Sequence, residues 1–172
     1  MARGERHDPT DELLEPGEKT VVVLEGVVSG FTRWSGLGGI VGILVALSVP
    51  RLFNLGFVLG AIAIVAVVTA VFALVYFVAG RPLARRNDPP LQSPYLTLHL
   101  TDRRVLLFDR QLSADVPTLV EATDVNDIST VRYGAAGALV PQRLSFVIRG
   151  TQHREYEFPR SQSVGEFVDH FA

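Results

Sequence analysis

The fold class of this chain is indicated by residues 52–78, LFNLGFVLGAIAIVAVVTAVFALVYFV. This stretch carries no charged side chain, and its few polar residues are Asn54, Thr69 and Tyr76. A helix needs about 20 apolar residues to cross the hydrocarbon core of a bilayer, which is about 30 Å thick. Residues 52–78 are longer than that, so the sequence predicts a membrane-spanning helix here.

The segment just before it, residues 34–49, is also apolar but shorter and rich in glycine. We interpret it as a second span, with a re-entrant segment or a buried core helix as the alternatives. Pro50 and Arg51 lie between the two segments and predict a tight turn, because proline interrupts a helix and arginine can sit among lipid head groups. Residues 34–78 are therefore expected to form a transmembrane helical hairpin.

Four glycines recur at four-residue spacing, Gly38 and Gly42 in the first segment and Gly56 and Gly60 in the second. Small residues at this spacing let helix backbones approach closely within a membrane. Packing of the two helices on each other within one chain is favoured, and the alternative is a homo-oligomer formed through the same faces.

Basic residues flank the hairpin: Arg33 precedes it and Arg81, Arg85 and Arg86 follow it, against Arg51 alone in the loop. By the positive-inside rule both termini should be cytoplasmic, in a protein integral to the cytoplasmic membrane. The four flanking arginines are also candidate contacts for membrane lipids at the surface. For Arg81, Arg85 and Arg86, a role in orientation alone is the competing interpretation.

Composition argues against several classes of function. The formal net charge of -2 gives no general attraction to nucleic acid, and the chain has no cysteine to act as nucleophile, disulfide partner or thiolate ligand. The four histidines are scattered without metal-ligand spacing, and no catalytic constellation emerges. We therefore predict no enzymatic activity, no cofactor and no metal site.

Three segments flank the hairpin, two before it and one after it, and each has a different expected structure. Residues 1–19 have the charge and the Pro/Gly content of a disordered acidic tail, whereas residues 20–28, TVVVLEGVV, read as a β-strand. An isolated strand is unstable in water, so this one is expected to complete the C-terminal domain; an amphipathic extension of the first helix is the alternative. Residues 79–94 form a basic and Pro-rich linker that should be extended and fairly stiff.

The C-terminal domain, residues 95–172, shows the two-residue alternation of half-buried strands. Tyr156 and Phe158 should face the core and Glu155 and Glu157 the solvent. Strands are expected at residues 95–101, 104–108, 118–121, 128–133, 144–149 and 154–158.

An amphipathic helix should end the chain. The spacing of Ser163 and Glu166 predicts a capping box at its start. An apolar stripe at helical spacing follows, made of Val164, Phe167, Val168 and Phe171.

Three segments carry a family resemblance. YLTLHLTDRRVLLF at residues 95–108 resembles the "Y-x-L-T-x-R-R" hairpin of bacterial pleckstrin-homology-like (PH-like) domains of the membrane-anchored kind. VNDISTV at residues 125–131 is similar to that family's "I-x-D-I-x-x-V" segment, and LEPGEK at residues 14–19 to its "L-x-P-G-E" segment. The resemblance implies an α+β membrane protein: a two-helix transmembrane hairpin plus a PH-like β-barrel or sandwich closed by a C-terminal helix.

The same resemblance implies a binding or scaffolding module, one that recruits an unidentified protein partner to the cytoplasmic membrane face. The alternative is a small accessory subunit of a membrane transport or assembly complex in which the hairpin is the working part. No charge lies within the predicted spans, which argues against an ion path. The turn around residues 101–104 is short and contains Asp102, so no phosphoinositide site is expected there; Arg103 and Arg104 should pair with acids such as Asp102 or Asp109.

Overall fold

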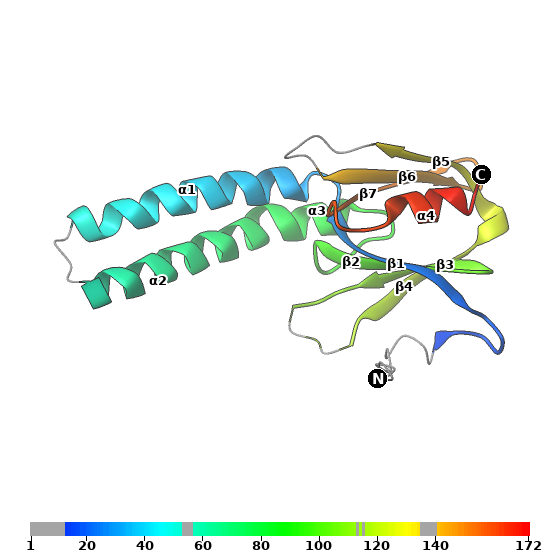
Figure 1. Cartoon of the computed structure of the whole chain (residues 1–172), viewed down its shortest axis with the longest axis horizontal. Coiled ribbons are helices and arrows are strands. Elements are labelled where there is room, and N and C mark those ends of the chain that lie inside the picture. Colours follow the sequence, from blue (N-terminus) through cyan, green and yellow to red (C-terminus); the bar gives the residue numbers. More distant parts are fainter. Residues whose placement is uncertain (1–12, 53–56, 113, 115, 135–140) are drawn as a thin grey trace, which may run out of the picture. The chain divides into compact units, whose positions relative to one another are not determined.

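The computed structural model describes residues 13–52, 57–112, 114, 116–134 and 141–172. It is an α+β protein with two long apolar helices and a seven-stranded sheet (Figure 1). The chain divides into two compact units. The sheet unit consists of the chain up to Gly26 together with Tyr95–Ala172, and the helical unit consists of Val27–Pro94.

The strands of the sheet follow the order β4-β3-β2-β1-β7-β6-β5. The first strand is thus central, so the helical hairpin is an insertion between β1 and β2. The predicted pairing of residues 20–28 with the C-terminal strands is observed. Their bounds are β1 (Thr20–Val28), β2 (Tyr95–Thr101), β3 (Arg104–Asp109), β4 (Thr118–Asp124), β5 (Ile128–Gly134), β6 (Gln142–Ile148) and β7 (Gln152–Phe158).

Backbone hydrogen bonds at both ends of β1 show that it runs antiparallel to β2. Asp102 N–H donates to the carbonyl of Lys19 at 3.0 Å, and Val28 N–H donates to the carbonyl of Pro94 at 2.9 Å. The pairs β2–β3, β3–β4, β5–β6 and β6–β7 are antiparallel as well. Apart from β1, the sheet is therefore built from neighbours in sequence.

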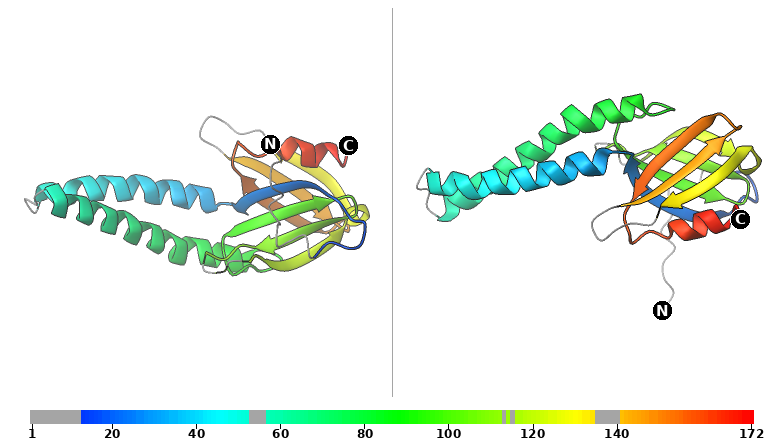
Figure 2. Two further views of the ribbon diagram at one scale, coloured as in Figure 1. Left: turned by 60° about the horizontal axis from the view of Figure 1, so that its bottom comes forward. Right: turned by 90° about the horizontal axis from the view of Figure 1, so that it is seen from above.

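Of the expected barrel or sandwich, the barrel is wrong, because in the described part of the chain the hydrogen-bonded sheet ends at β4 on one side and β5 on the other. These two strands are consecutive, yet the 3₁₀ turn η3 (Val125–Asp127) joins them without folding the chain back as a hairpin. Asp124 caps that turn, its carboxylate accepting from Asn126 N–H at 2.8 Å. Figure 2 shows β2–β4 and β5–β7 as two parts of one curved sheet.

The helix α4 (Val164–Asp169) covers the core of the sheet unit, as Figure 1 shows. Val164 and Phe167 are fully buried, and the Phe167 ring lies 6.1 Å from that of Phe146 on β6. The capping box is wrong: Ser163 occupies the N-cap position, but its side chain makes no capping hydrogen bond. Fully buried large side chains on the strands include Leu24, Leu96, Leu98, Leu100, Leu106, Phe108, Leu144, Tyr156 and Phe158.

One strand face departs from its predicted alternation. In β7 both Tyr156 and Phe158 are buried as expected, but Glu157 is also buried, with 1% of its surface exposed. Arg143 on the adjacent β6 lies 3.4 Å from its carboxylate. A buried charge is retained only with such a partner, so cross-strand pairing, which period-two alternation does not encode, accounts for the difference.

A left-handed glycine, Gly30, precedes the first helix, and its φ of 86° is a conformation that favours glycine. There the chain passes from β1 into α1 (Phe31–Leu52). Two corrections apply to this helix. It begins at Phe31 rather than Trp34, and it continues through Pro50 and Arg51, which were expected to form the turn. Pro50 lies within the last turn of α1 and removes a single backbone donor there.

The second helical segment is longer than the predicted 52–78. It comprises α2 (Phe57–Val75), a π-helical turn η2 (Tyr76–Gly80) and α3 (Arg81–Arg86). The first part of the linker predicted at 79–94 is therefore helical. In the π turn Arg81 N–H donates to the carbonyl of Tyr76, and Pro82, which has no N–H, follows directly.

Candidate functional site

The outer surface of the helical hairpin is unusual because it exposes many large apolar side chains. Phe31–Ser48 and Val58–Arg86 are long and apolar enough to cross a membrane, by length and composition. In the most apolar 18-residue window of each segment, only 17% of the residues in the first and 6% in the second are buried within the molecule. The core helix of a water-soluble domain would be mostly buried. Large apolar side chains with more than half of their surface exposed include Leu37, Ile40, Ile43, Leu44, Leu47, Val58, Leu59, Ile62, Val65, Leu74, Phe77 and Val78.

The inner surface of the hairpin is formed where two of the predicted glycines meet the second helix. A methyl group at Gly38 would collide with the side chain of Val75, and one at Gly42 would lie 3.3 Å from Val71 Cγ1. These glycines therefore pack helix on helix within one chain. Gly60 is buried, whereas Gly56 lies outside the described residues.

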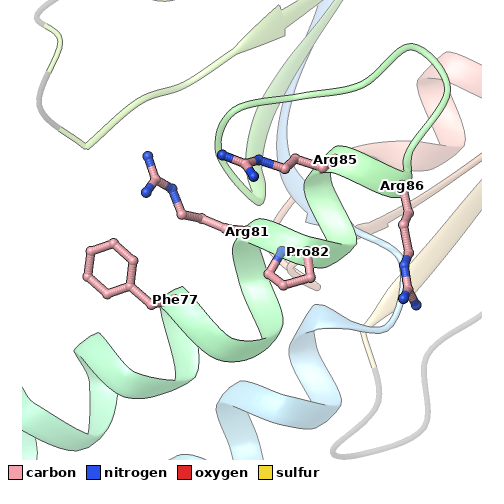
Figure 3. Close-up of a pocket in the computed structure, with 5 residues that line it drawn as sticks. All are labelled: Phe77, Arg81, Pro82, Arg85 and Arg86. Carbon is pink, nitrogen blue, oxygen red and sulfur yellow. The ribbon is translucent and has the colours of Figure 1, made fainter.

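A cluster of arginines marks the end of the second helical segment. Phe77, Arg81, Pro82, Arg85 and Arg86 line an open pocket of about 430 Å³, drawn in Figure 3. The guanidinium carbon of Arg81 lies 5.4 Å from the centroid of the Phe77 ring, a cation–π contact. Neither these three arginines nor Arg33, which is exposed on α1, has an ion-pair partner within the part of the chain that the structure describes.

Sequence reasoning selected the arginines of this pocket but missed Phe77 and Pro82. The signal was present, because Phe77, Arg81 and Arg85 recur every four residues, the spacing at which helical side chains share a face. The pocket can accept an anion: guanidinium groups present paired N–H donors that match carboxylate and phosphate oxygens.

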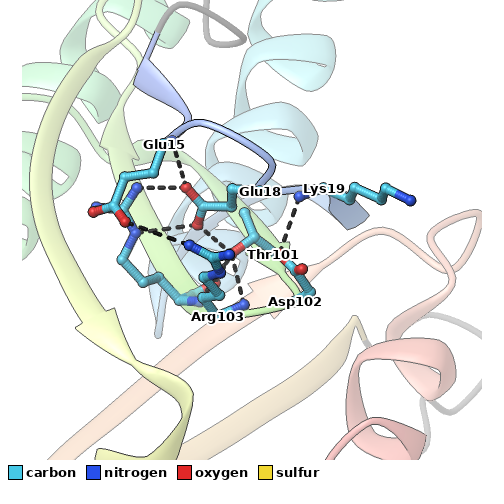
Figure 4. Close-up of polar contacts among 7 residues, drawn as sticks. Glu15, Glu18, Lys19, Thr101, Asp102 and Arg103 are labelled. Carbon is cyan, nitrogen blue, oxygen red and sulfur yellow. Dashed lines mark hydrogen bonds and ion pairs between the residues drawn. The ribbon is translucent and has the colours of Figure 1, made fainter.

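A second polar cluster ties the LEPGEK segment to the β2–β3 turn (Figure 4). Glu18, whose side chain is fully buried, accepts from Arg104 Nη2 at 2.5 Å and from Arg104 Nε at 3.1 Å. The Thr101 hydroxyl donates to the same carboxylate at 2.6 Å, and Glu15 N–H donates at 2.8 Å. These bonds, with that from Arg104 foremost, lower the pKa of Glu18 from 4.5 to about 2 against the opposing effect of burial.

This cluster corrects two expectations. Arg104 pairs with Glu18 and with Glu15, at 3.1 Å from its Oε1, rather than with Asp102 or Asp109. Arg103, which is more than half exposed, lies 3.9 Å from Glu15 and not beside Asp109 as an ion-pair partner. The last part of the predicted disordered tail, residues 13–19, is held on the sheet unit, while residues 1–12 lie outside the described residues.

The remaining titratable groups offer no second constellation. No group of three or more His, Asp or Glu residues is placed to hold a metal ion within residues 13–52, 57–112, 114, 116–134 and 141–172. His99 is buried in β2, with its ring 4.9 Å from Phe108, and His170 packs against Phe171. Arg154, buried on β7, pairs with Glu121 of β4 at 3.1 Å, a contact that the sequence pattern did not indicate.

Comparison of the chain with models of protein families, with characterised proteins and with solved structures found no match.

Proposed function

We propose that this chain is a membrane-anchored interaction module, in which α1 and α2 cross the cytoplasmic membrane and the sheet unit recruits a protein partner at its cytoplasmic face. The observation that carries the proposal is the exposure of the hairpin. Large apolar side chains are exposed along both helices, while Gly38 and Gly42 face the second helix. Lipid is the solvent that matches such a surface.

Charge supports the orientation. Arg33 at one end of α1 and Arg81, Arg85 and Arg86 at the end of the second segment outnumber Arg51. Antiparallel packing of the helices brings the four flanking residues to one end of the hairpin, because Phe31 lies against Gly80 and Gly38 against Val75. The positive-inside rule then assigns that end, and both termini, to the cytoplasm.

The experiment uses the absence of native cysteine. Single cysteines replacing Leu13, Asn54 or Ala172 are labelled with a membrane-impermeant maleimide on intact cells and on inverted membrane vesicles. We expect Leu13→Cys and Ala172→Cys to react only in inverted vesicles, and Asn54→Cys only on intact cells. Release of the chain from membranes by alkaline carbonate would contradict the anchor. Labelling of the two termini on opposite sides would mean that the hairpin does not span twice.

Recruitment by the sheet unit is supported by its exposed apolar strand residues. Val21 and Val23 on β1 expose 47% and 41% of their surfaces. Affinity capture from detergent-solubilised membranes, with the unchanged chain and with Val21→Ser/Val23→Ser, tests this role. A partner held by the unchanged chain and lost by the variant is expected. Equal capture by both would remove β1 as the recruiting surface.

A further inference from the structure

The arginine pocket at the end of the second helical segment contains a pair of guanidinium groups that point the same way. Figure 3 shows the side chains of Arg81 and Arg85 extending to one side of the helix and that of Arg86 to the other. The spacing explains this, since residues four apart share a helix face and Arg86 is turned about a quarter of a revolution from Arg85. Two cations are thus paired and a third, of equal charge, is not.

The paired arginines are available to a ligand. Neither has a carboxylate partner in the described ranges, in contrast with Arg104, which is saturated by Glu18 and Glu15. The guanidinium carbon of Arg81 lies 5.4 Å from the centroid of the Phe77 ring, and Pro82 is one of the residues that line the pocket. Two guanidinium forks beside an apolar wall match a phosphate group that is attached to an apolar body.

We propose that Arg81, Arg85 and Phe77 form a binding site for the phosphate of an anionic phospholipid headgroup. The inference rests on the proposed membrane anchor, because it requires the hairpin to place this pocket at the lipid headgroups. Phe77 and Val78 are 58% and 66% exposed and end the uncharged part of the segment, and Arg81 is the first charge after them. A phospholipid can contact the apolar and the charged residues together, whereas a free phosphate contacts only the latter.

The test compares double variants of equal charge in the detergent-solubilised full chain. Arg81→Gln/Arg85→Gln removes the paired cations, and Arg33→Gln/Arg86→Gln removes the same charge outside the pair. Binding of phosphatidylglycerol is titrated against phosphatidylcholine in mixed micelles. Each arginine near an anionic surface contributes a factor of about five wherever it lies, so diffuse attraction alone would weaken binding by either variant roughly 30-fold. The paired site adds to this for the first variant only, which should therefore bind phosphatidylglycerol several-fold more weakly than the second. Equal losses would show diffuse attraction and overturn the site.

Two further arms separate the remaining outcomes. Arg81→Lys/Arg85→Lys keeps the charge but not the forked donors, so binding should fall between the unchanged chain and the Gln variant; full retention would overturn the paired-donor geometry. Inorganic phosphate should not displace the lipid at similar concentrations, and displacement would assign the pocket to a soluble phosphate instead. Carbonate extraction of the same variants reports on the membrane anchor alone. A chain that is not anchored can therefore be distinguished from an anchored chain that lacks the lipid site.

Discussion

Replacing Glu18 with Gln should lower the free energy of unfolding of the sheet unit, because the Glu18 carboxylate accepts hydrogen bonds from Arg104 and Thr101. The pKa of Glu18 is lowered from 4.5 to about 2, chiefly by the two hydrogen bonds from Arg104. At 1.36 kcal/mol per pKa unit this corresponds to about 3 kcal/mol of stability at neutral pH. Glutamine mimics the protonated, neutral carboxyl, so a loss of about 3 kcal/mol is expected for Glu18→Gln.

The pH dependence has a definite sign. A carboxylate whose pKa is lower in the folded state stabilises fully above its unfolded value of 4.5, and the contribution is lost as the pH falls towards about 2. The stability difference between the unchanged chain and Glu18→Gln should therefore be largest at neutral pH and shrink progressively below about pH 4.5.

Urea unfolding of the detergent-solubilised full chain provides the assay, in a Trp34→Phe background so that near-ultraviolet circular dichroism reports on tyrosine, above all the fully buried Tyr156. Glu15→Gln is the matched control, since Glu15 also pairs with Arg104 but is 54% exposed and should contribute under about 1 kcal/mol. Equal destabilisation by the two variants at neutral pH, or a Glu18→Gln effect that persists in strong acid, would refute the reasoning.

Three other substitutions test packing and capping. Gly38→Ala should destabilise the hairpin by about 1–3 kcal/mol, because its methyl group would meet Val75, while Gly39→Ala, which has open space around it, should be neutral in thermal unfolding in detergent; equal effects would contradict the packing. Gly26→Ala should cost more than about 2 kcal/mol in urea unfolding, since its methyl group would lie 2.6 Å from the backbone carbonyl oxygen of Glu157; a neutral result would mean that β1 does not approach β7 so closely. Ser163→Ala should change stability by less than about 0.5 kcal/mol, and a loss near 1 kcal/mol would show that the side chain caps α4 after all.

Local patterns were sufficient to predict most of the secondary structure. The apolar runs indicated two helices. Strand propensity at residues 20–28 and two-residue alternation in the C-terminal domain indicated the strands to within a few residues of their observed bounds. Even the pairing of residues 20–28 followed from the rule that a lone strand is unstable. These are consequences of burial along one segment, which the order of side chains encodes directly.

The helix ends were predicted less well, because two prolines do not end the helices in which they lie. Pro50 was expected to end the first helix and residues 79–94 to be a linker, yet α1 continues to Leu52 and helix extends to Arg86. Pro50 removes one backbone donor in the last turn of α1, and Pro82 lies at the start of α3, directly after the π turn. Whether a proline ends a helix therefore depends on its position in the helix and on the backbone around it, which the residue type alone does not give.

The separation of a long apolar hairpin from a strand-rich unit can be predicted from the sequence, because hydropathy and its period are properties of short segments. The central place of β1, the open edges of the sheet and the pairing of Glu18 with Arg104 follow only from the tertiary structure. Glu18 and Arg104 are 86 residues apart. Contacts across such separations depend on how strands are ordered in space, and each carboxylate in a pattern of alternating residues looks the same until its partner is in place.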